Sequence, residues 1–146
     1  MAKIHLSRIV LDTSVIVAAF RSRKGASNKL LQFVATGRFR PLASTALFLE
    51  YEAVLLRAEQ RIVTGMSEAD VEGALAALAS ACDPVDVHFR WRPQLSDPAD
   101  EFVLEAAVNG RADALVTHNI RDFSAAGERF ELRVITPQQC LKEMSR

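Results

Sequence analysis

The sequence predicts an α/β fold in which helices cover both faces of a mostly parallel sheet. Short apolar runs alternate with segments of helical periodicity along the 146 residues. The apolar runs are continuous, as in strands buried on both faces, and do not alternate with polar residues. No repeat, low-complexity segment or linker interrupts this order. We therefore expect one domain over residues 1–146, a three-layer α/β/α sandwich of the Rossmann-like type.

The expected strands are short apolar runs bounded by polar or turn residues. They cover residues 8–11, 39–43, 85–87, 114–117 and 132–135. The expected helices cover residues 15–20, 27–35, 44–58, 68–82, 98–109 and 137–144. Residues 21–25 and 90–96 are expected to be loops.

Capping residues fix the expected helix starts. Ser27, Ser44 or Thr45, and Ser67 each precede a helical pattern, and Asp70 follows Ser67 at capping-box spacing. Asp97 is placed as an N-cap because Pro98 suits the first helical position.

Composition favours no particular partner. The 18 Lys and Arg residues balance the 18 Asp and Glu residues, so net charge steers the chain toward neither nucleic acid nor membrane. No apolar segment approaches membrane-spanning length, and residues 1–5 lack the apolar stretch of a signal peptide. Cys82 and Cys140 follow no metal or redox spacing. We expect a cytoplasmic protein with reduced thiols.

The first candidate site residue is Asp12, which follows the first strand directly. Sites in α/β folds form outside the carboxyl ends of the strands. Asp12, Thr13 and Ser14 could equally cap the next helix. Asp12 therefore gains a functional meaning only if other acids converge on it.

The second candidate is a pair of glutamates in the helix expected from residue 44. Leu47, Tyr51 and Val54, with Ala58, form its inward stripe. Glu50 and Glu52 lie on opposite shoulders of this stripe. Helical periodicity does not choose between them.

The third candidate is Asp100, on the helix that Asp97 caps. Val103 and Ala107 continue its face, so Asp100 borders the buried side and needs a partner, for which a metal ion is one choice. Glu101 and Glu105 are expected to point toward solvent.

The fourth candidate is the polar end of the strand at residues 114–117. Thr117, Asn119 and Asp122 can each offer oxygen near Asp12 if the two strands are neighbours, although a simple turn also accounts for them. The three histidines, His5, His88 and His118, form no zinc-like spacing.

Oxygen ligands of this kind suit Mg²⁺ or Mn²⁺, and Mg²⁺ usually keeps several waters. Two or three convergent carboxylates can therefore suffice when a substrate phosphate completes the shell. A metal ion so held can activate water for attack on a phosphodiester.

The order of these motifs resembles the PIN domain family, in particular the toxin components of toxin–antitoxin pairs. The motifs are residues 11–15, 49–55, 97–101 and 116–119, and the resemblance extends over nearly the whole chain. It implies a PIN-like α/β/α sandwich, Mg²⁺- or Mn²⁺-dependent cleavage of RNA, and frequent homodimers.

Carried over position by position, the resemblance assigns the metal-binding and catalytic acids to Asp12, Glu50 and Asp100. Asp97 is a possible supporting acid, and Thr117 matches the polar residue that closes the fourth strand. Thr13, Ser14, Thr117 and Asn119 would orient the carboxylates or water.

Asn119 departs from the family pattern, because many PIN nucleases carry a fourth Asp there. An amide can orient a ligand but brings no charge. Asp122, three residues on, is the candidate to supply the missing charge. We therefore expect weaker binding of a second metal ion.

The residues and the resemblance together predict a metal-dependent endoribonuclease, and the resemblance implies a toxin with a cognate antitoxin. The basic residues Arg21, Arg23, Lys24 and Arg121 could neutralise RNA phosphates. A non-catalytic PIN module that binds RNA or protein is the alternative, and Asn119 keeps it open. A phosphatase with an aspartyl intermediate ranks last, because position 14 is Ser where such enzymes usually need Asp.

Overall fold

A five-stranded parallel sheet forms the centre of the computed structural model, which describes residues 7–144. The strand order is β3-β2-β1-β4-β5, and all four neighbouring pairs are parallel. The strands are β1 (Arg8–Leu11), β2 (Arg40–Ala43), β3 (Asp83–Pro84), β4 (Ala114–Val116) and β5 (Arg133–Ile135).

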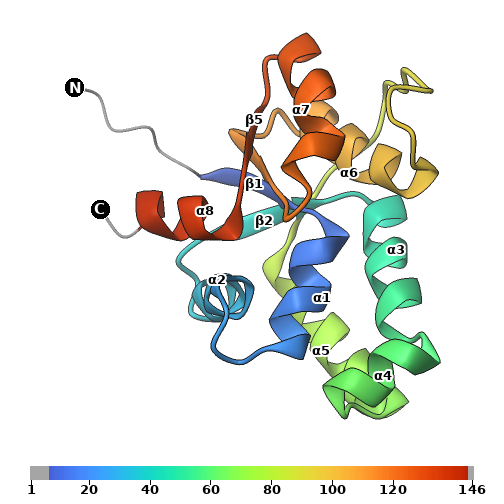
Figure 1. Ribbon diagram of the computed structural model, residues 1–146, viewed down its shortest axis with the longest axis vertical. Coiled ribbons are helices and arrows are strands. Elements are labelled where there is room, and N and C mark those ends of the chain that lie inside the picture. Colours follow the sequence, from blue (N-terminus) through green and yellow to red (C-terminus); the bar gives the residue numbers. More distant parts are fainter. Residues whose placement is uncertain (1–6, 145–146) are drawn as a thin grey trace.

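Helices cover both faces of this sheet. They are α1 (Thr13–Arg21), α2 (Ala26–Ala35), α3 (Thr45–Leu55), α4 (Ala58–Thr64), α5 (Glu68–Ala81), α6 (Pro98–Asn109), α7 (Ile120–Arg129) and α8 (Pro137–Met144). Figure 1 shows α6 and α7 on one side of the sheet and α1, α2 and α5 on the other. The predicted three-layer α/β/α sandwich is confirmed.

Strands β1 and β4 lie at the middle of the core. Ile9, Val10 and Leu11 of β1 and all three residues of β4 are almost completely buried. Leu11 is in register with Val116, so the residues that follow these two strands are neighbours. The chain order reverses direction between β1 and β4, and such a point is where α/β sheets bind ligands at their carboxyl edge.

Capping chemistry accounts for several helix starts as predicted. Ser44 accepts a hydrogen bond from the Leu47 backbone at the start of α3. Ser67 and Asp70 form a complete capping box on α5, and Asp97 caps α6 ahead of Pro98. Each cap satisfies backbone N–H groups that the helix itself leaves unpaired.

Two predicted elements were wrong at the edge of the sheet and after α3. The third strand is not residues 85–87 but Asp83–Pro84, because the chain pairs with β2 immediately after α5 ends. The helix expected over residues 44–58 ends at Leu55, and a second helix, α4, begins at Ala58.

Two further corrections concern helices α2 and α7. The N-cap of α2 is Gly25 and not Ser27, whose buried hydroxyl is hydrogen-bonded elsewhere. Helix α7 was not predicted, since its buried side consists mainly of one Phe and the small residues Ala126 and Gly127.

The prediction about residues 1–5, including His5, lies outside the described part of the chain. Over residues 7–144, no helix is long and apolar enough to span a membrane.

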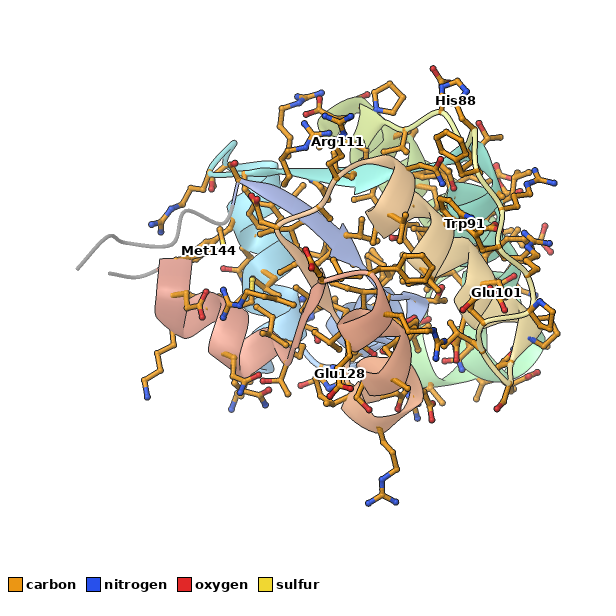
Figure 2. The ribbon with its side chains drawn as sticks, turned by 90° about the horizontal axis from the view of Figure 1, so that it is seen from above. His88, Trp91, Glu101, Arg111, Glu128 and Met144 are labelled. Atoms are coloured by element: carbon orange, nitrogen blue, oxygen red, sulfur yellow. The ribbon has the colours of Figure 1, made fainter. Side chains whose placement is uncertain are left out.

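A segment that we call the strap, residues 85–97, runs along α6 from its end to its start. The Asn109 carboxamide accepts from the backbone N–H groups of His88 and Phe89, both at 2.9 Å. Arg92 donates to both oxygens of Glu105, at 2.6 and 2.7 Å. Figure 2 shows the segment carrying Trp91 beside this helix.

The strap overturns the expectation that Glu101 and Glu105 face solvent. These side chains are only 4% and 6% exposed. One carboxylate oxygen of Glu101 accepts from the backbone N–H groups of Gln94 and Leu95, at 2.6 and 2.9 Å. Helical periodicity could not foresee this burial, because a distant segment causes it.

The close packing of α7 on β5 yields a stability prediction. A Cβ on Gly127 would lie 2.9 Å from the Leu132 carbonyl oxygen and 2.9 Å from a Val134 methyl carbon. We expect Gly127→Ala to destabilise the protein by about 1–3 kcal/mol, because the crowded backbone cannot yield easily. Gly73 of α5 is the matched control, with nothing within 4 Å of the same position.

In that control, Gly73→Ala should raise stability by about 0.5–1 kcal/mol, since alanine restricts the unfolded chain and favours helix. Urea unfolding monitored by circular dichroism measures both effects. Equal stability of the two variants would contradict the packing described for α7.

Candidate active site

Asp12 is a buried carboxylate at the carboxyl end of β1. It is 3% exposed. Its Oδ2 accepts two short hydrogen bonds, from Ser14 Oγ and Thr117 Oγ1, each at 2.6 Å. No donor or cationic side chain within residues 7–144 reaches its other oxygen, Oδ1. One half of the carboxylate is therefore fixed, and the other half is free for a ligand.

Both hydroxyls that bind Asp12 are oriented by backbone amides. The N–H of Asn119 donates to Thr117 Oγ1 at 2.9 Å, and the N–H of His118 donates to Ser14 Oγ at 3.3 Å. A hydroxyl that accepts from an amide is left to donate its own hydrogen. Two consecutive amides of the loop after β4 thus direct both hydroxyls toward Asp12.

Helix α2 also contacts the loop after β4. Ser27 Oγ and His118 Nε2 are hydrogen-bonded at 2.8 Å. Ser27 is buried, whereas the His118 side chain is exposed. His118 was expected to be a surface or packing residue and not a metal ligand, and its contact with Ser27 is structural. No feature of the sequence pointed to this contact.

Tyr51 connects α3 to the same edge of the sheet. Its hydroxyl donates to the carbonyl of Leu11, the residue before Asp12. Burial raises the pKa of Tyr51 well above its ordinary value, with smaller contributions from Cys82 and Asp12. Tyr51 was predicted only as part of the apolar stripe. The signal for its second role was the hydroxyl itself, because a buried tyrosine needs a hydrogen-bond partner.

Asp100 lies in the first turn of α6, near Asp12. Its pKa is raised to about 7, first by burial and then by the charges of Asp12, Asp97, Asp122 and Glu101. No hydrogen bond reaches the Asp100 carboxylate from the described residues 7–144. The Asp12 charge is thus close enough to oppose the ionisation of Asp100, and no cationic side chain in this part of the chain pairs with either carboxylate.

The remaining predicted residues surround this pair to different degrees. Asp97 and Asp122 are exposed and act on Asp100 through their charge. Asn119 is exposed, and its side chain does not cap α7. Glu50 and Glu52 are both half-buried on α3, and no contact with Asp12 or Asp100 joins either one to the site within residues 7–144. The structure therefore leaves the choice between the two glutamates open.

The donor set fits a divalent cation of the Mg²⁺ type. Within residues 7–144, no group of three His, Cys, Asp or Glu side chains forms a preassembled metal site. Mg²⁺, however, is usually bound by one or two carboxylates and several waters. Asp12 and Asp100 supply two carboxylates without a counter-charge. The hydroxyl of Thr13, the residue after Asp12, is buried and lacks a partner in the described chain.

A family model described as "PIN domain" matches residues 8–121. The chain belongs to the PIN domain family. PIN domains are generally nucleases and typically use divalent metal ions. A search among curated proteins finds no match.

This PIN domain is also similar to a solved structure, the crystal structure of VapBC2 from Rickettsia felis bound to a DNA fragment from their promoter. The match has a TM-score of 0.60 at 15% sequence identity and covers 88% of this chain and 98% of the other. At that identity the match supports the fold alone.

The raised pKa of Asp100 makes a prediction for the metal-free PIN domain. The folded state holds the Asp100 proton up to about pH 7, whereas the unfolded chain releases it near 3.8. The folded state therefore binds more protons between these values, and this group's contribution to stability falls as pH rises. Asp100→Asn removes that penalty, so it should raise the melting temperature more at about pH 8 than at about pH 5.

Differential scanning fluorimetry in a chelator measures this difference, with roughly 2–4 °C expected for each kcal/mol regained. Glu72→Gln is the control, because Glu72 is exposed on α5. If Asp100→Asn lowered the melting temperature at the higher pH, the description of an uncompensated carboxylate would be wrong.

Proposed function

We propose that this PIN domain is a Mg²⁺- or Mn²⁺-dependent endoribonuclease and the toxin component of a toxin–antitoxin pair. The observation that carries the proposal is the pair Asp12 and Asp100. One is a buried carboxylate with a free oxygen, and the other has a pKa raised to about 7 by burial and by neighbouring acids. A divalent cation between them removes the electrostatic conflict.

Each residue of the site has its own role in this proposal. Asp12 and Asp100 hold the metal ion, and Glu50 binds it directly or through water and helps to remove a proton. Ser14 and Thr117 keep Asp12 Oδ2 occupied, so that Oδ1 faces the ligand. When bound, the ion supplies an activated water and neutralises charge on the phosphodiester. Thr13, Asp97, Asn119 and Asp122 surround this centre.

Substrate binding needs positive charge outside the acidic centre. Arg21, Arg23 and Lys24, at and after the end of α1, are exposed, as is Arg121 at the start of α7. We assign these side chains to RNA phosphates, where each contact adds salt-dependent affinity.

The partners in this proposal are RNA, a cognate antitoxin and a second copy of the chain, in the cytoplasm. The antitoxin is proposed from the resemblance of the motifs to toxin components and from the fold shared with VapBC2, whose structure holds a DNA fragment from their promoter. A neighbouring gene that encodes a short DNA-binding protein would agree with a toxin. A solitary gene would instead favour a role in RNA processing.

The central prediction is the loss of RNA cleavage in Asp12→Asn. The amide keeps the shape of Asp12 but removes the charge that holds the cation. We expect cleavage of a mixed RNA substrate in Mn²⁺ to fall at least about 100-fold, and the wild type to lose it equally in a chelator.

Binding of Mn²⁺ by calorimetry gives a second readout that does not depend on activity. Its heat should disappear in Asp12→Asn as well. A wild type without metal-dependent heat and without cleavage would instead identify a non-catalytic module that binds RNA or protein. Cleavage that persists unchanged in Asp12→Asn would show that Asp12 is not a ligand.

Glu50 and Glu52 form a matched pair for a second prediction. Both are half-buried on α3, two residues apart. We expect Glu50→Gln to lower kcat/KM by about 10- to 100-fold, the usual effect of losing a group that supports a metal site. Glu52→Gln should leave kcat/KM close to the wild-type value. The reverse result would transfer the assigned role to Glu52.

A further inference from the structure

The strap carries an exposed cluster of aromatic rings. Phe89 and Trp91 stack with ring centroids 5.3 Å apart and an angle of 18° between the planes. Phe130, after the end of α7, lies 5.6 Å from Trp91. The side of this cluster that faces away from the protein is open, because Phe89 is 60% and Trp91 46% exposed. Large aromatic rings left together in water usually mark a binding surface.

Contacts within the protein hold the backbone of the strap in place around the rings. The Asn109 side chain of α6 holds the backbone of Phe89, accepting from its N–H at 2.9 Å and donating to its carbonyl at 3.0 Å. Arg92, the residue after Trp91, is bound to Glu105 through two hydrogen bonds. A ligand that stacks on the rings therefore meets a surface that needs little ordering.

Arginines without carboxylate partners accompany the rings. Arg90, between Phe89 and Trp91, is exposed and forms no ion pair within residues 7–144. Arg129 donates to the Gln94 carbonyl at 3.0 Å, a bond that leaves its positive charge uncompensated. Figure 2 places the acidic Glu128 well away from Trp91. The strap and the adjoining end of α7 thus carry stackable rings and two arginine charges that no carboxylate of the described chain compensates.

Contacts along α6 connect the strap to the candidate active site. Four residues after Trp91, the backbone of Leu95 is bound to Glu101, the neighbour of Asp100. Asn109, which holds the backbone of Phe89, lies nine residues after Asp100 on α6, about 13.5 Å along a helix that rises about 1.5 Å per residue. A strand whose phosphodiester sits at Asp100 can therefore bring a nucleotide a few positions along the strand to the rings.

We propose that the strap is a base-stacking platform for single-stranded RNA, with Phe89 and Trp91 receiving unpaired bases and Arg90 and Arg129 contacting their phosphates. The proposal rests on the ribonuclease function above and adds to it a binding subsite on the strap, away from Asp12 and Asp100. Base stacking on aromatic rings is available only to unpaired bases, and the charge pattern matches a phosphate backbone better than a purely apolar protein surface.

Trp91 is the only tryptophan of the chain, so the protein's intrinsic fluorescence reports on the platform. A ten-nucleotide oligouridylate, added in a chelator to prevent cleavage, should quench this fluorescence, because a stacked base contacts the indole directly. A blunt duplex RNA of the same length should not quench it. An unchanged spectrum with both RNAs would overturn the proposal and leave the strap as a surface for protein.

A second test measures the affinity of variants for a fluorescein-labelled oligouridylate. Trp91→Ala should weaken binding by about 5- to 150-fold, the range for loss of one stacked base, whereas Trp91→Phe should retain most of it. Ile62→Ala is the matched control, since Ile62 is 82% exposed on α4, away from the strap. Equal affinity of Trp91→Ala and wild type would overturn the proposal.

Arg90→Gln extends the test to a side chain whose removal should leave the fold intact. It should weaken binding and lower the slope of log affinity against log salt by about 0.7, the value for one phosphate contact on a single strand. Arg57→Gln is the control, because Arg57 is exposed between α3 and α4. An unchanged slope in Arg90→Gln would remove Arg90 from the platform.

The binding measurements can contradict the stacking platform without contradicting the nuclease proposal, and the cleavage assay can do the reverse. Quenching of Trp91 without metal-dependent cleavage would contradict only the catalytic function. Cleavage of RNA without quenching and without an effect of Trp91→Ala would contradict only the stacking platform.

Discussion

The burial of Asp12 is the constraint on which the rest of the site depends. A carboxylate that is removed from water must be hydrogen-bonded or paired with a cation, since otherwise it costs several kcal/mol. Here one oxygen receives the hydroxyls of Ser14 and Thr117. Thr117 can reach Asp12 only because β4 lies beside β1, which is where the strand order reverses direction. The order of the strands therefore determines whether this buried carboxylate receives its hydrogen bonds.

Helix α6 carries two acids that have hydrogen-bond partners within residues 7–144 and one that has none. Of its three acids, Glu101 is satisfied by two backbone N–H groups and Glu105 by Arg92, and both sets of donors come from the strap. Asp100 receives no such donor within residues 7–144, and its pKa rises to about 7. The strap therefore provides hydrogen-bond donors for Glu101 and Glu105 and leaves Asp100 as the acid of α6 without a partner in the described chain.

Features that depend on residues close together in the chain, such as helix caps and strand ends, could be predicted from the sequence. The wrong predictions concern side chains whose contacts come from distant segments. Asp12 and Thr117 were predicted together because each follows a buried strand, and the capping of α5 and α6 depended on residues next to each helix start. The burial of Glu101 was missed because a segment outside the helix covers it. Ser27 was assigned to a cap because its bond to His118 spans 91 positions of the chain. Glu50 was chosen over Glu52 by resemblance, and the described contacts do not test that choice.

Position 119 shows how a departure from a family pattern can be tolerated. From the sequence, Asn119 appears as a missing acid, but its backbone N–H is what orients Thr117 toward Asp12. That contribution does not depend on the side chain, so Asn in place of Asp leaves the arrangement of Asp12 intact. The exchange changes the charge instead. An Asp at position 119 would bring one more negative charge to the loop after β4, whereas Asn119 brings none. The weaker binding of a second metal ion that this difference suggested therefore stays a prediction, separate from the backbone contact that position 119 makes.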